Sequence, residues 1–171
     1  HRHGTPAERR TLDALMARLA DGDREVFARV FDALWSPIHR LCISLLKNEA
    51  DASDAAQEAM SKILERASDY DKSRPAMPWA MAIAAWECRT LARKRTRRRE
   101  AGEPPKEHGG EHPEEEFVQR NLTAAAVAAL GELSEADRET LVATFWDEAA
   151  SVSGATLRKR RERALDRLRK T

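Results

Sequence analysis

The chain has 171 residues and a formal net charge of +1, from 30 Lys and Arg against 29 Asp and Glu. This length fits one domain of ordinary size or two small ones. Because the charge is balanced, the chain is not a uniformly basic protein, and its net charge does not indicate a polyanionic partner. No run of about 18 apolar residues occurs in the sequence, so we expect no membrane-spanning helix.

Charge is nevertheless distributed unevenly along the chain. Residues 93–99 (RKRTRRR) hold six basic residues in seven, and residues 158–170 hold eight in thirteen. Between these blocks, residues 100–116 carry seven Glu against one Lys. Two basic blocks separated by an acidic stretch predict local surfaces for an anionic partner.

The first part of the chain shows the period of amphipathic helices, with apolar residues at i, i+3, i+4 and i+7. The first stripe is Leu12, Leu15, Met16 and Leu19. The second is Val26, Phe27, Val30, Phe31 and Leu34. The third is Ile38, Leu41, Cys42 and Leu45. Pro37 stands between the second and third, and we expect it to end one helix or to open the next.

Two more helices follow in this part. Asp51 or Ser53 is expected to cap a helix whose apolar positions are Ala56, Ala59, Met60, Ile63, Leu64 and Ala67. Residues 68–78 (SDYDKSRPAMP) are predicted to form a loop, because Pro75 and Pro78 forbid a continuous helix. Trp79, Ile83 and Trp86 then stripe a helix that continues into the first basic block. No segment alternates with period two, so the predicted fold class is all-α.

A linker separates this helical part from a second one. Residues 102–113 (GEPPKEHGGEHP) hold three Gly, three Pro and no large apolar residue, and such a segment cannot bury enough surface to offset its ordering entropy. We therefore predict two small helical domains, residues 1–99 and residues 118–171, joined by a flexible linker over residues 100–117.

The second domain is predicted to contain three helices. The first carries Leu122, Ala126, Ala129, Leu130 and Leu133. Ser134 followed by Asp137 has the spacing of a capping box for the next, which carries Leu141, Val142 and Phe145. The last, residues 154–170, places Leu157, Ala164, Leu165 and Leu168 on one narrow face. Ser153 or Thr156 can cap it, and its opposite face is mostly cationic.

The composition of the last helix leaves two interpretations open. A helix N-terminus with a capping hydroxyl and basic residues in its first turn suits a DNA backbone, and such a helix fits the major groove. Alternatively, Glu162 and Asp166 pair with their basic neighbours on a solvated helix that contacts nothing.

Catalysis and cofactors find no support in the sequence. No HExxH motif, Gly-rich phosphate loop or nucleophile elbow occurs, so we expect neither an enzyme nor a cofactor. Cys42 and Cys88 lie outside any CxxC pattern, which predicts free buried thiols in a reducing cytoplasm. No signal peptide is recognisable. His108 and His112 lie in the linker, where a solvated spacer is the preferred interpretation over a metal site.

From Val26 to Arg99 the chain resembles the second region of bacterial sigma factors, and especially the small extracytoplasmic function (ECF) group. The resemblance rests on DASDAAQEAMSKIL (51–64), YD (70–71) and RPAMPWAMAIAAWECRTLARKRTRR (74–98). Residues 130–143 and 152–169 resemble the fourth region of the same family. The resemblance covers about 130 residues, with the motifs in the family's order and the linker in its place.

This resemblance implies a polymerase-binding helix. The matching positions are Asp51, Asp54, Gln57 and Glu58, which in the family dock on the clamp coiled coil of the polymerase β′ subunit. Asp51, Asp54 and Glu58 are expected to share one helix face. Solvated carboxylates with an N-cap are the alternative, and a dimetal carboxylate site is a weaker one because no His completes it.

The resemblance also implies two DNA-binding elements. For the minus-ten promoter strand, cations can follow the backbone of unpaired DNA, and the candidates are Arg89, Arg93, Lys94, Arg95, Arg97 and Arg98. Trp79 is interpreted as core rather than as a stacking platform. Trp86 stands where the family usually has Asn, and Glu87 beside it is expected to bring an unfavourable charge towards DNA. For the minus-thirty-five element, the candidates are Thr156, Arg158, Lys159, Arg160 and Arg163.

The fourth region departs from the family pattern. Only WDEAASV lies between Phe145 and Ser153, so this chain lacks roughly two helical turns, which is most of the supporting helix of a helix-turn-helix. The resemblance implies a promoter-specificity subunit that binds core RNA polymerase and promoter DNA, with an anti-sigma factor as a candidate partner. The alternatives are a stand-alone DNA-binding regulator and a sigma-derived protein-interaction module.

Overall fold

The computed structural model describes residues 5–102, 134–145 and 154–170. Their order is α1 (Pro6–Ala20), a 3-10 turn (Arg24–Val26), α2 (Phe27–Leu46), α3 (Glu49–Glu65), a second 3-10 turn (Ala67–Asp69), α4 (Ala76–Ala101), α7 (Glu135–Phe145) and α8 (Gly154–Lys170). No strand occurs in these ranges, and the predicted all-α class is confirmed. None of the described helices is long and apolar enough to cross a membrane.

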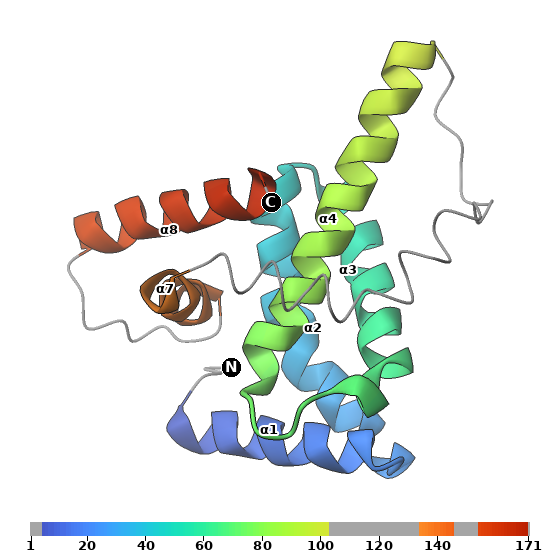
Figure 1. Cartoon of the computed structure of the whole chain (residues 1–171), viewed down its shortest axis with the longest axis vertical. Coiled ribbons are helices and arrows are strands. Elements are labelled where there is room, and N and C mark those ends of the chain that lie inside the picture. The colour runs from blue at the N-terminus through green and yellow to red at the C-terminus, as the bar shows by residue number, and fades with distance from the viewer. Residues whose placement is uncertain (1–4, 103–133, 146–153, 171) are drawn as a thin grey trace.

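Three long helices form the centre of the molecule. α2, α3 and α4 pack side by side, α1 crosses one end of this bundle, and the basic C-terminal half of α4 extends beyond the opposite end (Figure 1). The predicted stripes supply the core, because Leu12, Met16, Val30 and Leu34 are at most 1% exposed. Phe27 is the exception at 45% exposed, so its assignment to the buried stripe was wrong.

Pro37 does not interrupt the second helix, contrary to expectation. α2 is continuous from Phe27 to Leu46 with Pro37 buried inside it. An interior proline costs about 3 kcal/mol, but Val30 and Leu34 before it and Ile38 and Leu41 after it are all fully buried on the same face. Each such side chain contributes about 1.5–3 kcal/mol, so burial outweighs the lost hydrogen bond.

The cap of α3 also differs from the prediction. Lys47 adopts the left-handed conformation that ends α2, with φ 54°, and Asn48 then caps α3 by accepting from the backbone N–H of Asp51 at 3.0 Å. Asp51 and Ser53, the predicted caps, lie inside the helix. Asn is a favourable N-cap, so α3 begins at Glu49, two residues before Asp51.

α4 begins earlier than the proline pattern suggested. Pro75 is its N-cap and Pro78 lies in its first turn, where a missing N–H leaves no helical hydrogen bond unmade. The loop is therefore confined to residues 70–75. At the other end the helix stops at Ala101, where Gly102 takes φ 67° as the C-cap, two residues past the predicted end of the first domain.

α7 and α8 pack against each other and against the bundle. The hydroxyl of Ser134 accepts from the backbone N–H of Asp137 at 3.2 Å, which confirms the predicted cap. Ala164, Leu165 and Leu168 are buried as predicted. Thr156 lies inside α8 rather than at its cap. Several predicted features lie outside the residues that the structure describes. They are the linker, the expected helix over residues 122–133, the shortened stretch before Ser153, Ser153 itself, and the side chains of Leu157, Val142 and Phe145.

Both thiols are buried and free, as predicted. A hydrogen bond with Cys42, together with burial, raises the pKa of Cys88 far above its usual range. The Cys88 thiol is therefore protonated at neutral pH and has little nucleophilic character.

Candidate protein- and DNA-binding surfaces

The four candidate polymerase-binding residues divide into two groups. Gln57 and Glu58 are exposed and Asp54 is half-buried, so these three lie on the open side of α3. Asp51 is only 8% exposed, and its carboxylate forms an ion pair with the guanidinium of Arg95 on α4. The structure thus brings a predicted polymerase contact and a predicted DNA contact together, between two helices of the same bundle.

A second ion pair lies between the same helices, deeper in the bundle. Lys62 Nζ on α3 lies 2.7 Å from Glu87 Oε1 on α4 and 3.4 Å from Glu58 Oε1 one turn back on α3. The Lys62 and Glu87 side chains are 13% and 6% exposed, whereas that of Glu58 is 56% exposed. Glu87 therefore faces α3, and the expectation that its charge confronts DNA was wrong.

The titration of this pair reflects its burial. Burial raises the pKa of Glu87, and the attraction and hydrogen bond of Lys62 offset only part of this effect. Burial lowers the pKa of Lys62, but the attraction and hydrogen bond of Glu87, with a smaller contribution from Glu58, outweigh it and raise this pKa overall. Lys62 thus favours the charged form of Glu87 and Glu87 favours the charged form of Lys62, which agrees with their separation of 2.7 Å.

An aromatic column on α2 borders the α3 surface and was not recognised from the sequence. Phe31 and Trp35 stack with ring centroids 5.6 Å apart, and Trp35 and His39 stack at 5.5 Å. His39 Nε2 lies 3.1 Å from the hydroxyl of Ser53 on α3. The sequence signal was the repeated i, i+4 spacing of aromatic rings. A search for apolar core positions does not separate such rings from the other apolar residues of the buried stripe.

The loop of residues 70–75 is held by local and long-range contacts. The Asp71 carboxylate accepts from the backbone N–H and hydroxyl of Ser73 at 2.9 and 2.6 Å. The backbone N–H of Ala76, at the start of α4, donates to Asp13 Oδ1 on α1 at 2.8 Å. Tyr70 donates its hydroxyl hydrogen to the carbonyl of Arg74. These contacts fix the direction in which α4 leaves the bundle.

Trp79 lies beneath this loop and is 5% exposed. Its ring packs on Tyr70 with centroids 5.4 Å apart. This position confirms the interpretation of Trp79 as a core residue and leaves no exposed face on which an unpaired base could stack.

Tyr70 gives a direct test of the loop, because it is the only tyrosine of the chain. Burial, followed by the charges of Asp13 and Asp71, raises the pKa of Tyr70 to about 12, so phenolate absorbance at 295 nm should begin to rise well above the ordinary midpoint near 10. Because the folded value exceeds the unfolded one, the free energy of unfolding should fall as pH rises from about 10 to 12. The urea-denatured chain should titrate near 10, and a midpoint near 10 in the folded chain would contradict the buried loop.

The basic half of α4 presents different cations to different surroundings. Arg93, Lys94, Arg95 and Arg97 are exposed, and Arg89 and Arg98 are half-buried. The guanidinium of Arg89 lies over the Trp86 ring, 5.4 Å from its centroid, in a cation–π contact. Trp86 is the residue at which the sequence departs from the Asn of the family pattern. Arg95 is directed to Asp51. Arg93 and Arg97 have no ion-pair partner in the described part of the chain.

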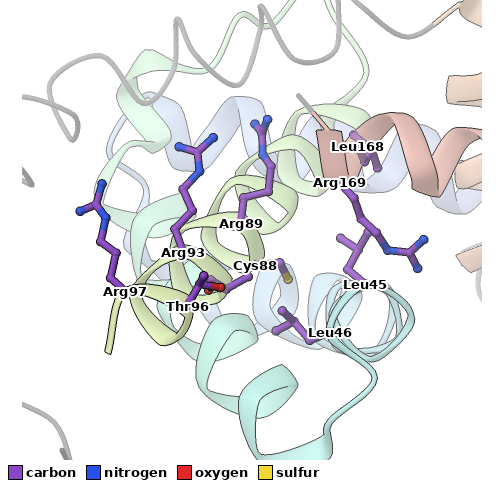
Figure 2. A pocket seen from close by; sticks show the side chains of 10 residues that line it. Leu45, Leu46, Cys88, Arg89, Arg93, Thr96, Arg97, Leu168 and Arg169 are labelled. Atoms are coloured by element: carbon purple, nitrogen blue, oxygen red, sulfur yellow. The ribbon is translucent and has the colours of Figure 1, made fainter. Parts of the chain in front are cut away.

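A groove of about 410 Å³ separates this part of α4 from the ends of α2 and α8. Figure 2 shows Arg89, Arg93 and Arg97 side by side along α4, with Cys88 and the leucines of α2 below them. Leu168 and Arg169 of α8 close the other side, and Arg169 Nη2 donates to the carbonyl of Ser44 at 2.8 Å. The groove thus has an apolar floor and a cationic rim.

The candidate minus-thirty-five residues lie outside the buried face of α8. Thr156, Arg158, Lys159, Arg160 and Arg163 are all exposed. Arg167, one turn after Arg163 on the same side of the helix, forms an ion pair with Asp137 of α7 at 2.6 Å. The Asp166 carboxylate pairs with Arg169 at 2.8 Å, as the solvated-helix interpretation expected. Lys159 and Arg163 lie farthest from the buried residues of α8, and Arg158 and Arg160 lie on opposite flanks of the helix.

Comparison with known proteins matches residues 30–98 to the family described as Sigma-70 region 2. Over 82 residues the chain is 27% identical to ECF RNA polymerase sigma factor SigK of Mycobacterium ulcerans (strain Agy99), covering 47% of this chain and 44% of that protein. Over 63 residues it is 33% identical to ECF RNA polymerase sigma factor SigW of Bacillus subtilis (strain 168), covering 37% of this chain and 34% of that protein. The match spans less than half the length of these relatives.

A solved structure described as CnrH in complex with the cytosolic domain of CnrY is also similar. The likeness has a TM-score of 0.48 and 20% identity, and covers 91% of this chain and 93% of that one. The sequence matches confirm the predicted resemblance over the second region. Residues 30–98, which run from α2 into the basic end of α4, are therefore a Sigma-70 region 2 domain, and over this domain the chain is a relative of the ECF RNA polymerase sigma factors.

Proposed function

We propose that this chain is a promoter-specificity subunit that binds core RNA polymerase and directs it to promoter DNA. One observation carries the proposal: the Sigma-70 region 2 match coincides with α2, α3 and α4, and these helices expose carboxylates and arginines on separate surfaces. The chain itself would catalyse no reaction. It would act in the cytoplasm, where polymerase and promoter DNA are found.

The open side of α3 is the proposed docking surface for the β′ clamp coiled coil. Asp54, Gln57 and Glu58 supply acceptors for cations and amides of a partner helix, and the aromatic column on α2 borders them through the contact of His39 with Ser53. Asp51 would not contact the partner directly. Its ion pair with Arg95 would hold α4 against the helix that carries the docking surface.

The proposed DNA surfaces are the basic half of α4 and the open side of α8. A helix that projects beyond its bundle, as α4 does (Figure 1), can follow a phosphate backbone without a clash from its neighbours. The α8 cations would anchor upstream duplex DNA. An anti-sigma factor that covers both kinds of surface would hold the chain inactive.

Gel filtration of the purified chain with core RNA polymerase tests the proposal. The wild-type chain should co-elute at moderate salt, and the Asp54→Lys, Glu58→Lys double variant should not, because two lysines replace the acceptors on the docking surface. Glu49→Lys makes a charge reversal on the opposite face of the same helix and should leave co-elution intact. Separate elution of a folded wild-type chain would overturn the proposal and favour a sigma-derived interaction module or a stand-alone DNA-binding regulator.

A further inference from the structure

The buried carboxylate of Glu87 has no role in the surfaces described so far. It lies on the bundle side of α4, and Lys62 on α3 stands between it and the exposed Glu58. Lys62 Nζ is within the distance of a strong charge-assisted hydrogen bond from Glu87, at 2.7 Å, but beyond it from Glu58, at 3.4 Å. One ammonium group is thus shared unequally between a buried carboxylate and an exposed one.

The buried pair is a poor source of stability. Folding raises the pKa of Glu87, which lowers stability as Glu87 ionises, and it raises the pKa of Lys62, which adds stability while Lys62 is charged, so the two effects oppose each other. A buried ion pair can often be replaced by apolar side chains without loss of stability. Lys94 adds only a weaker attraction for Glu87, and Glu58 opposes its ionisation. The pair is therefore expected to have a role other than stabilising the fold.

The geometry points to Glu87 as a positioning residue for the docking surface: by holding the Lys62 ammonium below the surface, it leaves the Glu58 carboxylate available to a cation of the partner. This inference rests on the proposed function, since the partner is the polymerase clamp helix. Without Glu87, the ammonium would turn fully to Glu58, four residues away on the same helix. Lys62 would then compete with the cation of the partner for the same oxygens.

Two variants separate this role from a merely structural one. Glu87→Gln keeps the size of the side chain and removes its charge, so Lys62 should move towards Glu58. In a crystal structure of this variant the distance from Lys62 Nζ to Glu58 should shorten to about 2.8 Å. Its dissociation constant for core polymerase should rise by about 3- to 10-fold, within the range of coupling between neighbouring charges. Glu49→Gln, the same chemical change at an exposed position of α3, should alter neither quantity.

The decisive variant replaces both members of the pair by methionine. Lys62→Met with Glu87→Met leaves Glu58 without its competitor, so polymerase affinity should return to the wild-type value or exceed it. Affinity as weak as that of Glu87→Gln would overturn the inference, because it would show that the pair only maintains the fold. A Lys62–Glu58 distance unchanged in Glu87→Gln would overturn it as well. If the wild-type chain failed to bind polymerase, the proposed function would be wrong, whereas the crystallographic distance would still report whether Glu87 controls Lys62.

Discussion

Replacing Trp79 with alanine is expected to lower the free energy of unfolding by about 3–5 kcal/mol. The side chain is 5% exposed and packs on the ring of Tyr70, beneath the loop that leads into α4. Truncation removes this contact and leaves a cavity between α4 and the loop. Urea unfolding followed by circular dichroism should show a lower midpoint with an unchanged slope, since the surface exposed on unfolding stays nearly the same.

Trp79→Phe is the matched control for this experiment. The indole N–H of Trp79 has no hydrogen-bond partner in the described part of the chain, so a phenyl ring gives up no polar contact. Its cost should be well under that of alanine, and DNA binding should be unaffected. A cost for Trp79→Ala below about 1 kcal/mol would show that the ring is not core, and a base-stacking role would then regain support.

The core was predictable because it depends on local spacing. Leu12, Met16, Leu34 and Ile63 recur at helical intervals, and each is buried at the position the pattern assigned. Periodicity reports which face of a helix is apolar, and an apolar face has to be covered by whatever the helix packs against. The same reasoning failed for Phe27. Its spacing places the ring beside the buried positions, but spacing does not show whether a neighbouring helix extends far enough to cover it.

Pro37 and Asn48 show a second limit. Local rules assign Pro37 to a helix boundary, but the decision depends on the total burial of the side chains on both sides, which only the packed structure determines. Asn48 was a suitable cap by residue type, yet Asp51 and Ser53 were equally suitable. The choice among them depends on where α2 stops, which the left-handed conformation of Lys47 sets.

The charged residues were the least predictable part of the candidate site. Sequence spacing grouped Asp51 with Asp54 and Glu58, and the family resemblance grouped Arg95 with Arg93, but Asp51 and Arg95 instead pair with each other across α3 and α4. Glu87 pairs with Lys62 in the same way. These partners are far apart in the sequence, and no local pattern indicates which charge will find a counter-charge on a neighbouring helix. The two pairs hold the helix assigned to polymerase against the helix assigned to DNA.

This pairing predicts that the cations of α4 contribute unequally to DNA binding. Arg93 and Arg97 line the open groove, whereas Arg95 is already neutralised by Asp51. In the complex with core polymerase, Arg93→Ala and Arg97→Ala should each weaken promoter binding about tenfold or more, since a hydrogen bond to a charged group contributes about 1.5–3 kcal/mol. Each should also reduce the slope of log Kobs against log salt concentration by about 0.7, the value for one phosphate contact on a single strand.

Arg95→Ala is the comparison that makes this prediction specific. The substitution changes the charge of the chain by the same amount, so a purely long-range effect of net charge would make all three variants alike. A binding titration of the three holoenzymes over a range of KCl concentrations distinguishes the two cases. A change of slope well below about 0.7 for Arg95→Ala would show that Asp51 retains this arginine in the complex. A full change for all three would mean that DNA draws Arg95 away from Asp51, and the ion pair between α3 and α4 would then open as the promoter binds.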